Sequence, residues 1–242
     1  MNRYLQLKSL VLILLFLFIT SAAYPLQSKE AFKNTPATTQ TETVVLVHGL
    51  LRSSISMFFL KHFLQHQGYE VYSYNYPSAK YNIHQHAQSF EQYLLKFMRE
   101  HPSTRVHFVT HSLGGIVVRE TLANLSDKQL QQIGYLIMLA PPSQGSAYAN
   151  AALHIPLINK LVAPLKELSS DKQSYVHQVP IPKVKMGIIS GHYDTVVPRD
   201  AAYLNSETER VEVNAMHTFI MNNNKAKQFI LTFLKKGSFN NT

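Results

Sequence analysis

The sequence predicts an α/β fold, in which a mostly parallel sheet of about six strands carries helices on both faces and a short, mainly helical insertion. Short runs of branched and aromatic residues alternate along the chain with segments whose apolar residues recur at helical spacing. This alternation is typical of parallel strands joined by right-handed helical crossovers. Serine, histidine or glycine follows several of the predicted strands, at the edge of the sheet where such folds bind their ligands.

The fold begins with two strands separated by a helix. Residues 43–47 form a branched, apolar run that predicts a buried strand, and residues 69–74 predict a second one. Between them, Ser53 or Ser54 can cap a helix that ends at Gly68, since serine accepts hydrogen bonds from a first turn and glycine tolerates the conformation that ends one. The apolar residues of this helix share one face: Leu60, Phe63 and Leu64.

A second helix and an abrupt strand-to-helix turn follow. Apolar residues at helical spacing predict a helix that ends before Pro102, and these residues are Ala87, Phe90, Leu94 and Phe97. A third strand over residues 105–110 then turns into a helix over residues 113–125, with Ser112 at the apex. A serine at such a turn exposes its hydroxyl group, and its neighbours must be small because strand and helix crowd together.

The residues around Ser112 meet this demand on one side only. Gly114 and Gly115 are small, but Thr110 stands where glycine is usual, two residues before the serine. The sequence leaves two explanations open. Either a slightly wider turn accommodates Thr110, or Ser112 has a structural role.

The second half of the chain completes the sheet. Strands are predicted over residues 134–139, 184–190 and 209–213, and a last helix carries Ala226, Phe229, Ile230, Phe233 and Leu234 on one face. The alternation of predicted strands and helices is interrupted over residues 143–182. There, the sequence indicates one amphipathic helix, with Pro156 near its start and Pro164 interrupting it. Its apolar residues are Ile158, Leu161, Val162, Leu165 and Leu168. Because this insertion follows a strand, we expect it to act as a cap or lid over the site.

The N-terminus resembles an export signal. Arg3 and Lys8 precede an apolar run over residues 10–20, and the small residues Ser21, Ala22 and Ala23 provide a cleavage site after Ala23. The run is shorter than the roughly 20 residues of a membrane span, so a cleaved signal is favoured over an uncleaved anchor. We therefore expect a signal peptide over 1–23, a flexible lead-in over 24–42, one domain over 43–236 and a tail over 237–242, in a periplasmic or extracellular protein.

The composition narrows the choice of partners. The formal net charge is +9, and removal of Arg3 and Lys8 leaves 9 − 2 = +7, which favours anionic surfaces such as membranes or cell envelopes. The basic residues are scattered and form no nucleic-acid motif, so no nucleic-acid partner is expected. The absence of cysteine excludes disulfides, thiolate catalysis and thiolate metal ligands. We assume a monomer.

Three residue types that nucleophilic catalysis requires follow three predicted strands. Ser112 follows the third strand, Asp194 the fifth and His217 the sixth. A serine hydroxyl needs a base to take its proton, and the base needs a partner that fixes its tautomer. Because all three positions lie at the carboxyl ends of strands, we expect them to converge. Asp200 and His192 remain alternatives for the acid and the base.

Four segments in this order resemble the α/β-hydrolase superfamily, and specifically compact secreted serine lipases and esterases. They are Val47-His48-Gly49-Leu50, Thr110 to Gly115, Gly191 to Pro198, and the late His217. The resemblance implies that Ser112 is the nucleophile of an acyl-enzyme, His217 the general base and Asp194 its orienting acid. It also implies that the backbone N–H groups of Leu50 and Leu113 form the oxyanion hole.

The substrate is predicted less directly. Met57 and Phe58 follow the oxyanion loop, and Ile158 and Leu161 lie in the insertion, so these four side chains are candidates for an acyl pocket, although each can equally belong to the core. The favoured substrate is a lipid or other hydrophobic ester, with a membrane or lipid surface as a further partner. His48 and His111 are expected to shape the loops, and neither a metal nor another cofactor is expected.

Two other functions remain open from the sequence. An acyltransferase would use the same three residues but pass the acyl group to an alcohol other than water. A non-catalytic, hydrolase-like binding protein of the cell envelope would use none of them.

Overall fold

The computed structural model describes residues 42–204 and 208–240 of the chain. Its internal contacts divide the chain into two units, Met1–Thr39 and Gln40–Thr242, and the description below concerns the second. The predicted signal over residues 1–23 and the predicted lead-in over residues 24–42 lie outside the described residues, apart from Glu42, which begins the first strand. Both stay predictions.

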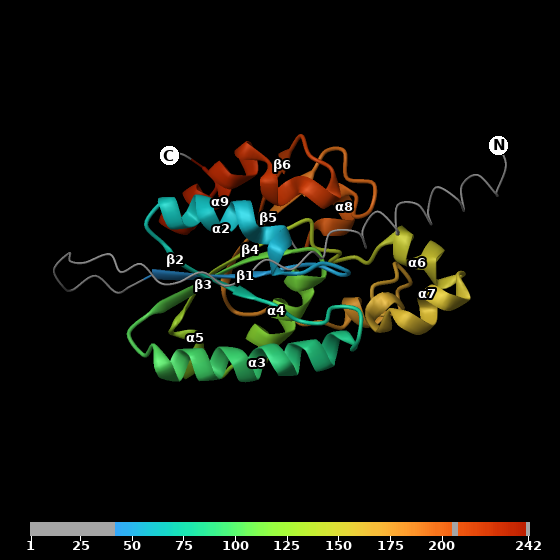
Figure 1. The fold of residues 1–242 in the computed structure, drawn as a ribbon, viewed down its shortest axis with the longest axis horizontal. Coiled ribbons are helices and arrows are strands. Elements are labelled where there is room, and N and C mark those ends of the chain that lie inside the picture. Colours follow the sequence, from blue (N-terminus) through green and yellow to red (C-terminus); the bar gives the residue numbers. More distant parts are fainter. Residues whose placement is uncertain (1–41, 205–207, 241–242) are drawn as a thin grey trace. The chain divides into compact units, whose positions relative to one another are not determined.

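Six parallel strands form a single sheet (Figure 1), which confirms the predicted fold class. The strand order across the sheet is β2-β1-β3-β4-β5-β6. Each predicted strand is present to within about one residue at either end, because short branched runs bounded by turn residues define buried strands well. The bounds are β1 Glu42–Val47, β2 Glu70–Tyr74, β3 Arg105–His111, β4 Ile133–Leu139, β5 Lys185–Gly191 and β6 Glu209–Val213.

Four long helices cover the two faces of the sheet. Helices α2 (Phe58–His66) and α9 (Asn224–Lys236) lie on one face, and α3 (Ile83–Glu100) and α4 (Leu113–Asn124) on the other (Figure 1). The chain moves outward from β1 to β2 and then back past β1 to β3. Because right-handed crossovers in opposite directions place their helices on opposite faces, α2 and α3 are separated by the sheet.

Each face of the sheet carries its own hydrophobic cluster, and alternate residues of a strand supply the two. In β1, Val45 and Val47 belong to the cluster under α3 and α4, whereas Val44 and Leu46 belong to the cluster under α2 and α9. This alternation follows from the two-residue repeat of a strand. Both faces are fully covered, which explains why the strands read as continuous apolar runs.

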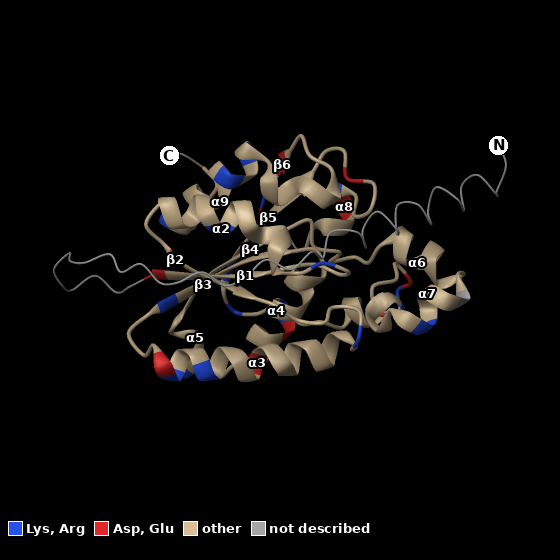
Figure 2. Cartoon of the chain, in the orientation of Figure 1, with Lys and Arg blue, Asp and Glu red and all other residues tan. Residues whose placement is uncertain are grey.

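The charged side chains of the described residues are spread over the surface. Figure 2 shows Lys and Arg on helices of both faces, including α2, α3 and α9, with Asp and Glu between them. Among the same residues, no helix combines the length and the apolar character that crossing a membrane requires.

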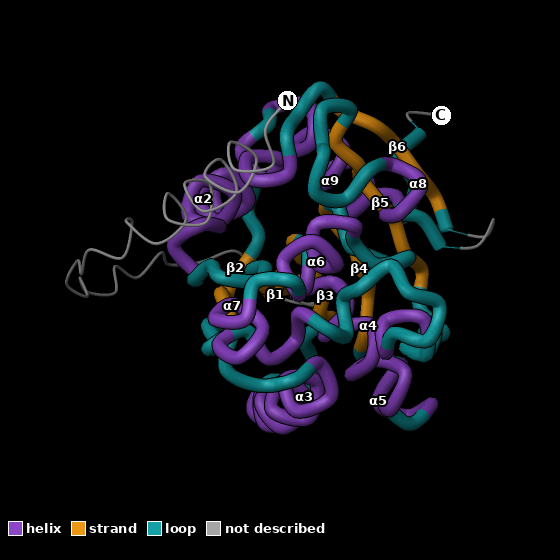
Figure 3. The backbone as a smooth tube through the Cα atoms, turned by 90° about the vertical axis from the view of Figure 1, so that its right-hand side faces the viewer, coloured by secondary structure: helices purple, strands orange, loops and turns teal. Residues whose placement is uncertain are grey.

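The segment between β4 and β5 holds four short helices: α6 (Ala147–Leu153), α7 (Pro156–Leu161), η2 (Ala163–Leu165) and η3 (Tyr175–His177). Figures 1 and 3 show α6 and α7 beyond the carboxyl ends of the strands. The apolar pattern predicts a single interrupted helix over residues 158–168. The chain instead breaks at Val162, and it adds α6, whose short alanine-rich sequence has no long apolar stripe to reveal it.

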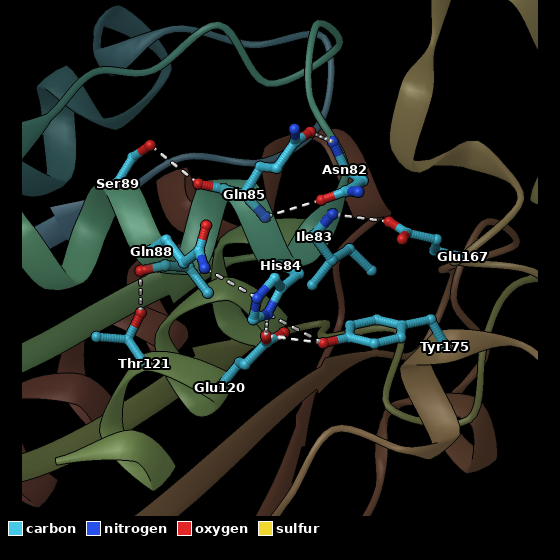
Figure 4. Close-up of polar contacts among 11 residues, drawn as sticks. Asn82, Ile83, His84, Gln85, Gln88, Ser89, Glu120, Thr121, Glu167 and Tyr175 are labelled. Atoms are coloured by element: carbon cyan, nitrogen blue, oxygen red, sulfur yellow. Dashed lines mark hydrogen bonds and ion pairs between the residues drawn. The ribbon is translucent and has the colours of Figure 1, made fainter.

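Polar contacts fasten this insertion to the two helices below it (Figure 4). Tyr175 donates its hydroxyl proton to Glu120 Oε1 of α4 at 2.8 Å, and His84 Nδ1 of α3 lies 2.6 Å from the same oxygen. Glu167 Oε2 accepts a hydrogen bond of 2.7 Å from the backbone N–H of Ile83, at the start of α3. The insertion is therefore held by side chains as well as by its apolar contacts.

The remaining short helices were not predicted. They are α5 (Asp127–Leu130), α8 (Arg199–Ala202) and η4 (His217–Asn222). The predicted helix that ends at Gly68 is divided into η1 (Ser54–Met57) and α2, and Ser53 is the N-cap of η1 without a side-chain capping hydrogen bond. A helix of one turn has too few residues for a periodic apolar pattern, so tertiary contacts decide its conformation.

Candidate active site

Ser112 has an unusual backbone conformation at the junction of β3 and α4. Its φ is 51° and its ψ is −125°, which is rare for a residue with a side chain. Its own N–H donates to Leu139 O of the neighbouring strand at 2.9 Å, and its C=O accepts from Gly115 N at 2.9 Å. These two bonds hold the strained turn, so the hydroxyl stands clear of the sheet edge.

The two glycines after Ser112 allow α4 to approach the strands closely. A Cβ atom on Gly114 would lie 2.6 Å from the carbonyl oxygens of both Val47 and His48, so only glycine fits there. A Cβ atom on Gly115 would lie 3.1 Å from Thr110 Oγ1. Thr110 is fully buried, and its methyl and hydroxyl groups thus occupy space that Gly115 leaves open.

The structure brings Ser112, His217 and Asp194 into one hydrogen-bonded line. His217 Nε2 lies 3.0 Å from Ser112 Oγ, and His217 Nδ1 lies 2.7 Å from Asp194 Oδ2. Only the neutral tautomer with its proton on Nδ1 can donate to the carboxylate and accept from the serine hydroxyl at the same time. The three residues come from the ends of β3, β5 and β6.

Asp194 is fixed from the other side by its own loop. Its Oδ1 accepts from Val196 N at 2.9 Å and from Val197 N at 2.8 Å, and its side chain is fully buried. Bonds of this kind stabilise an ionised carboxylate and fix its rotamer. The other oxygen is left for the histidine.

The two alternatives from the sequence have other partners. Asp200 is exposed and pairs with Arg199 at 3.5 Å, and His192 Nδ1 lies 2.9 Å from Glu212 Oε1. Neither contacts Ser112 or His217. The hydrogen-bonded line therefore contains Asp194 and His217 rather than these two residues.

The loop after β1 lies directly against Ser112. A Cβ atom on Gly49 would come within 3.0 Å of Ser112 Cβ and 2.9 Å of His111 Nδ1. Within the described part of the chain, the N–H groups of Leu50 and Leu113 donate to no protein acceptor. Both predicted oxyanion donors are thus unoccupied beside the serine.

His48 and His111 are buried neutral side chains that support these loops. His48 Nδ1 donates to Gly49 O at 2.9 Å, its Nε2 accepts from Tyr76 N, and burial lowers its pKa to about 4. His111 Nε2 donates to the carbonyl oxygen of His217 at 3.0 Å, and burial lowers the pKa of His111 well below its usual value. As expected, both histidines shape loops.

The four predicted substrate residues lie in different environments. Met57 is fully buried in the cluster under α2 and α9, so it is a core residue, which is one of the two readings that its sequence position allowed. Ile158 packs partly buried against the other cluster. Phe58 and Leu161 are exposed: half of the surface of Phe58 and 64% of the surface of Leu161 are accessible to solvent.

A cavity of about 430 Å³ lies within the insertion, away from the hydrogen-bonded line. Its walls include Leu153, Lys166, Glu167 and Tyr175, but none of the three predicted catalytic residues. Over residues 42–204 and 208–240, no three His, Cys, Asp or Glu side chains are grouped to hold a metal ion.

Several residues at the site have no sequence signal that singles them out. Leu51 (φ 55°) and Ala140 (φ 45°) share the positive φ of Ser112, and the three lie after β1, β4 and β3. Arg52, next to Leu51, is a partly buried cation at the same edge. Positive φ at residues other than glycine concentrates at functional sites, but it is visible only in the folded chain.

One family model matches the chain over residues 38–170, and its description is "Putative serine esterase (DUF676)". The match covers more than half of the chain and includes both the loop after β1 and the turn at Ser112. No curated protein matches the chain.

Solved structures of α/β-hydrolases share the fold at low sequence identity. The mature lipase BlEst2 of Bacillus licheniformis has a TM-score of 0.67 and 18% identity, over 82% of this chain and 92% of its own. Lipase B of Aspergillus fumigatus has a TM-score of 0.65 and 13% identity, over 81% of this chain and 52% of its own. Phospholipase PlaB of Legionella pneumophila has a TM-score of 0.56 and 22% identity, over 67% of this chain and 44% of its own. At these identities the likeness establishes the fold.

Proposed function

The chain belongs to the DUF676 family of serine esterases, and from this premise we propose that it hydrolyses carboxylic esters through an acyl-enzyme on Ser112. The family makes the chain a carboxylic ester hydrolase, and the proposal assigns the chemistry to residues. One observation supports the assignment above all others: the unbroken line from Ser112 Oγ to His217 Nε2 at 3.0 Å and from His217 Nδ1 to Asp194 Oδ2 at 2.7 Å.

In the proposed reaction, His217 Nε2 takes the proton of Ser112 as Oγ attacks the ester carbonyl carbon. The carbonyl oxygen becomes an oxyanion and receives the N–H groups of Leu50 and Leu113. The tetrahedral intermediate then collapses, His217 donates its proton to the leaving alcohol, and Ser112 remains acylated. A water molecule, deprotonated by the same histidine, hydrolyses the acyl-enzyme. Asp194 stabilises the imidazolium that forms in each step.

The test compares the wild type with Ser112→Ala on p-nitrophenyl esters of increasing acyl length. We expect kcat to fall by about 10⁴–10⁶ in the variant, because the substitution removes the nucleophile. Asp194→Asn should lower kcat by about 10⁴, because the amide stabilises the wrong tautomer of His217. Circular dichroism verifies that each variant is folded. Equal activity in wild type and Ser112→Ala would refute the assignment.

Labelling and product analysis separate the alternatives. A fluorophosphonate probe should modify Ser112 in the folded wild type, and a lack of labelling would favour a non-catalytic binding protein. Release of free acid in the presence of acceptor alcohols would support hydrolysis. Transfer of most of the acyl group to the alcohol would instead identify an acyltransferase.

We propose that the acyl part of the substrate is hydrophobic. Large apolar side chains are exposed on α2, at and beside η4, and on α7 of the insertion, and they are Phe58, Phe59, Met216, Phe219 and Leu161. Helix α2 contacts η4, which begins at His217, so the first four of these side chains lie on adjoining elements. An exposed apolar group of this kind marks a site for an apolar ligand or a lipid surface. The names of the solved neighbours, two lipases and a phospholipase, agree with this substrate class.

A further inference from the structure

Arg52 lies on the loop that separates the proposed oxyanion donor Leu50 from helix η1. At one end of this loop, Gly49 lies against Ser112 and His111. At the other end, Ser54 N donates to Asn75 Oδ1 at 3.0 Å. The loop is thus anchored on both sides of Arg52, and its position beside the serine is fixed by the fold.

The guanidinium group of Arg52 is partly buried and has no partner. None of the ion pairs or side-chain hydrogen bonds of the described residues includes it. Burial lowers the pKa of Arg52, since the protein replaces part of the water around the charge. Arg119, the other buried arginine, differs: it donates to Val179 O at 2.6 Å. The nitrogen atoms of Arg52 are not among the buried polar atoms without a partner in the described part of the chain, so they stay accessible to water and to a ligand.

The charge of Arg52 reaches the hydrogen-bonded line. Burial lowers the pKa of His111 most, and its neighbour His217 and the positive charge of Arg52 lower it further. His111 in turn donates to the carbonyl oxygen of His217 at 3.0 Å. Among the described residues, the carboxylate of Asp194 makes its ion pair with His217 and accepts from two backbone N–H groups, and it makes no ion pair with Arg52. An arginine without an ion-pair partner among the described residues therefore lies on the loop whose Gly49 packs against Ser112.

Exposed apolar side chains follow Arg52 directly. Ile55 on η1 and Phe58 at the start of α2 are exposed over half of their surface or more. A cation beside an apolar surface is complementary to an amphiphile whose anionic group is close to its acyl chain. Guanidinium is well suited to this role because it donates two parallel hydrogen bonds to a phosphate or a carboxylate.

We propose that Arg52 binds an anionic group of the ester substrate, close to the bond that is cleaved, and that the preferred substrates are anionic acyl esters. This inference rests on the proposed ester hydrolysis at Ser112. It adds a specificity residue to that reaction, with the anionic group on Arg52 and the acyl chain along Ile55 and Phe58.

The test measures kcat/KM for two esters that share an octanoyl chain, both kept below their critical micelle concentrations. One is 1-octanoylglycerol 3-phosphate and the other is the neutral 1-octanoylglycerol. We expect the wild type to prefer the phosphate, and Arg52→Gln to reduce this preference by about tenfold, as expected for the loss of one partly screened, charge-assisted hydrogen-bonded pair. Arg52→Lys should restore part of it. Arg99→Gln, the same change at an exposed site on α3, should leave the preference as in the wild type.

Two further arms identify the anion and the role of Arg52. O-octanoyl lactate replaces the phosphate by a carboxylate, so a loss on both anionic esters indicates a general anion site and a loss on the glycerophosphate alone indicates a phosphate site. Added NaCl should weaken the preference of the wild type and not that of Arg52→Gln, because salt screens the charge. An equal loss on neutral and anionic esters would overturn the proposal, since Arg52 would then support the common chemistry.

Direct binding keeps this inference distinct from the proposed function. Calorimetry with octyl phosphate and with octyl glucoside, on Ser112→Ala protein with and without Arg52→Gln, needs no turnover. We expect octyl phosphate to bind about tenfold more weakly when Arg52 is replaced. Ester hydrolysis that depends on Ser112, together with unchanged octyl phosphate binding, would overturn the anion site alone. Absence of Ser112-dependent ester hydrolysis in the wild type, together with octyl phosphate binding that depends on Arg52, would overturn the proposed function alone.

Discussion

Single residues at the carboxyl edge of the sheet carry backbone strain that the rest of the fold supports. Leu51, Ser112 and Ala140 have positive φ, and they follow β1, β3 and β4, which are neighbours in the sheet. Each such residue costs of order 1–3 kcal/mol, so the surrounding contacts must impose the conformation. In Ser112 the strain has a visible result, because it directs the hydroxyl group toward His217.

The packing of a single side chain against Gly115 explains why threonine is accepted at position 110. Thr110 fills the space above Gly115, and replacement by glycine leaves a cavity in a buried position. We expect Thr110→Gly to lower the free energy of unfolding by about 1–3 kcal/mol, measured by urea denaturation. The double variant with Gly115→Ala should recover part of the loss, since the new methyl group occupies that space. Stabilisation by Thr110→Gly would show instead that the threonine is strained.

Buried histidines make stability depend on pH. Burial lowers the pKa of His48 and of His107 to about 4 and that of His111 well below 6.5. Between pH 6.5 and pH 4 the unfolded chain binds protons that the native chain does not, so the free energy of unfolding falls as the pH falls. The slope is about 1.4 kcal/mol per pH unit for each histidine that is protonated only in the unfolded chain.

His107 offers the clearest variant for this test. Its Nδ1 accepts from Tyr135 N at 3.0 Å, and its ring, neutral above its pKa of about 4, makes no ion pair with Glu42 at 3.7 Å. Urea unfolding at pH 7 and at pH 5 measures how much the free energy of unfolding falls between the two pH values. We expect this fall to be smaller for His107→Asn than for the wild type. His62→Asn, at an exposed position, is the control. Identical slopes in wild type and His107→Asn would contradict the assignment.

At the scale of elements, the insertion depends on side chains from two helices. Glu120 of α4 accepts from Tyr175 at 2.8 Å and faces His84 of α3 at 2.6 Å, while its other oxygen, Oε2, is buried without a partner among the described residues. Burial raises the pKa of Glu167, whose Oε2 accepts from the N–H of Ile83. These contacts link the chain after β4 to the start of α3 and the middle of α4.

Removal of one link should loosen the insertion more than the sheet. We expect Tyr175→Phe to lower the free energy of unfolding by about 1–2 kcal/mol, because it leaves the buried Glu120 with one donor fewer. Hydrogen exchange should rise over residues 143–182 and stay unchanged over β3 and β4. Tyr148→Phe is the matched control, since its hydroxyl reaches only Thr195 Oγ1, at 3.5 Å. Equal exchange in both variants would argue against the link.

For the whole molecule, scattered positive charge and the exposed apolar side chains around α2 and η4 suggest how the protein would bind a lipid surface. The formal net charge is +9, without a basic block, so the attraction to an anionic surface is general. The exposed apolar side chains around α2 and η4 are local, and they lie at the edge of the sheet that holds Ser112. Charge would therefore bring the protein to the surface, and the apolar residues would orient it.

Vesicle binding tests these separate roles of the positive charge and of the exposed apolar side chains. We expect Phe59→Ser to bind vesicles of anionic phospholipid about 10- to 100-fold more weakly, because a phenyl group that enters the lipid contributes about 1.5–3 kcal/mol. Added NaCl should weaken binding of wild type and variant alike. Ile181→Ser removes an apolar side chain exposed before β5, at the opposite end of the strands, and serves as control. If the control binds as weakly as Phe59→Ser, the orientation proposed for the protein is wrong.

The sequence alone determined the six strands, the long helices and the candidates Ser112, Asp194 and His217. Strand and helix periodicity is set by neighbouring residues, and parallel strands bring their carboxyl ends together whatever the details of packing. Chain order and position after a strand were therefore enough to make the three residues candidates, while the contacts of Asp200 and His192 in the structure separated them from these alternatives. The structure then set the distances of 3.0 Å and 2.7 Å that link them.

Only the tertiary structure decided how distant residues share space. It buried Met57 while exposing Phe58, placed Thr110 over Gly115 and joined Tyr175 to Glu120. It also left Arg52, on the loop that packs against Ser112, without a partner in the part of the chain that the structure describes. Each of these facts depends on contacts between residues far apart in the chain, or on the absence of such a contact. Local pattern contains no information about them, because burial and pairing of a side chain are properties of the packed whole.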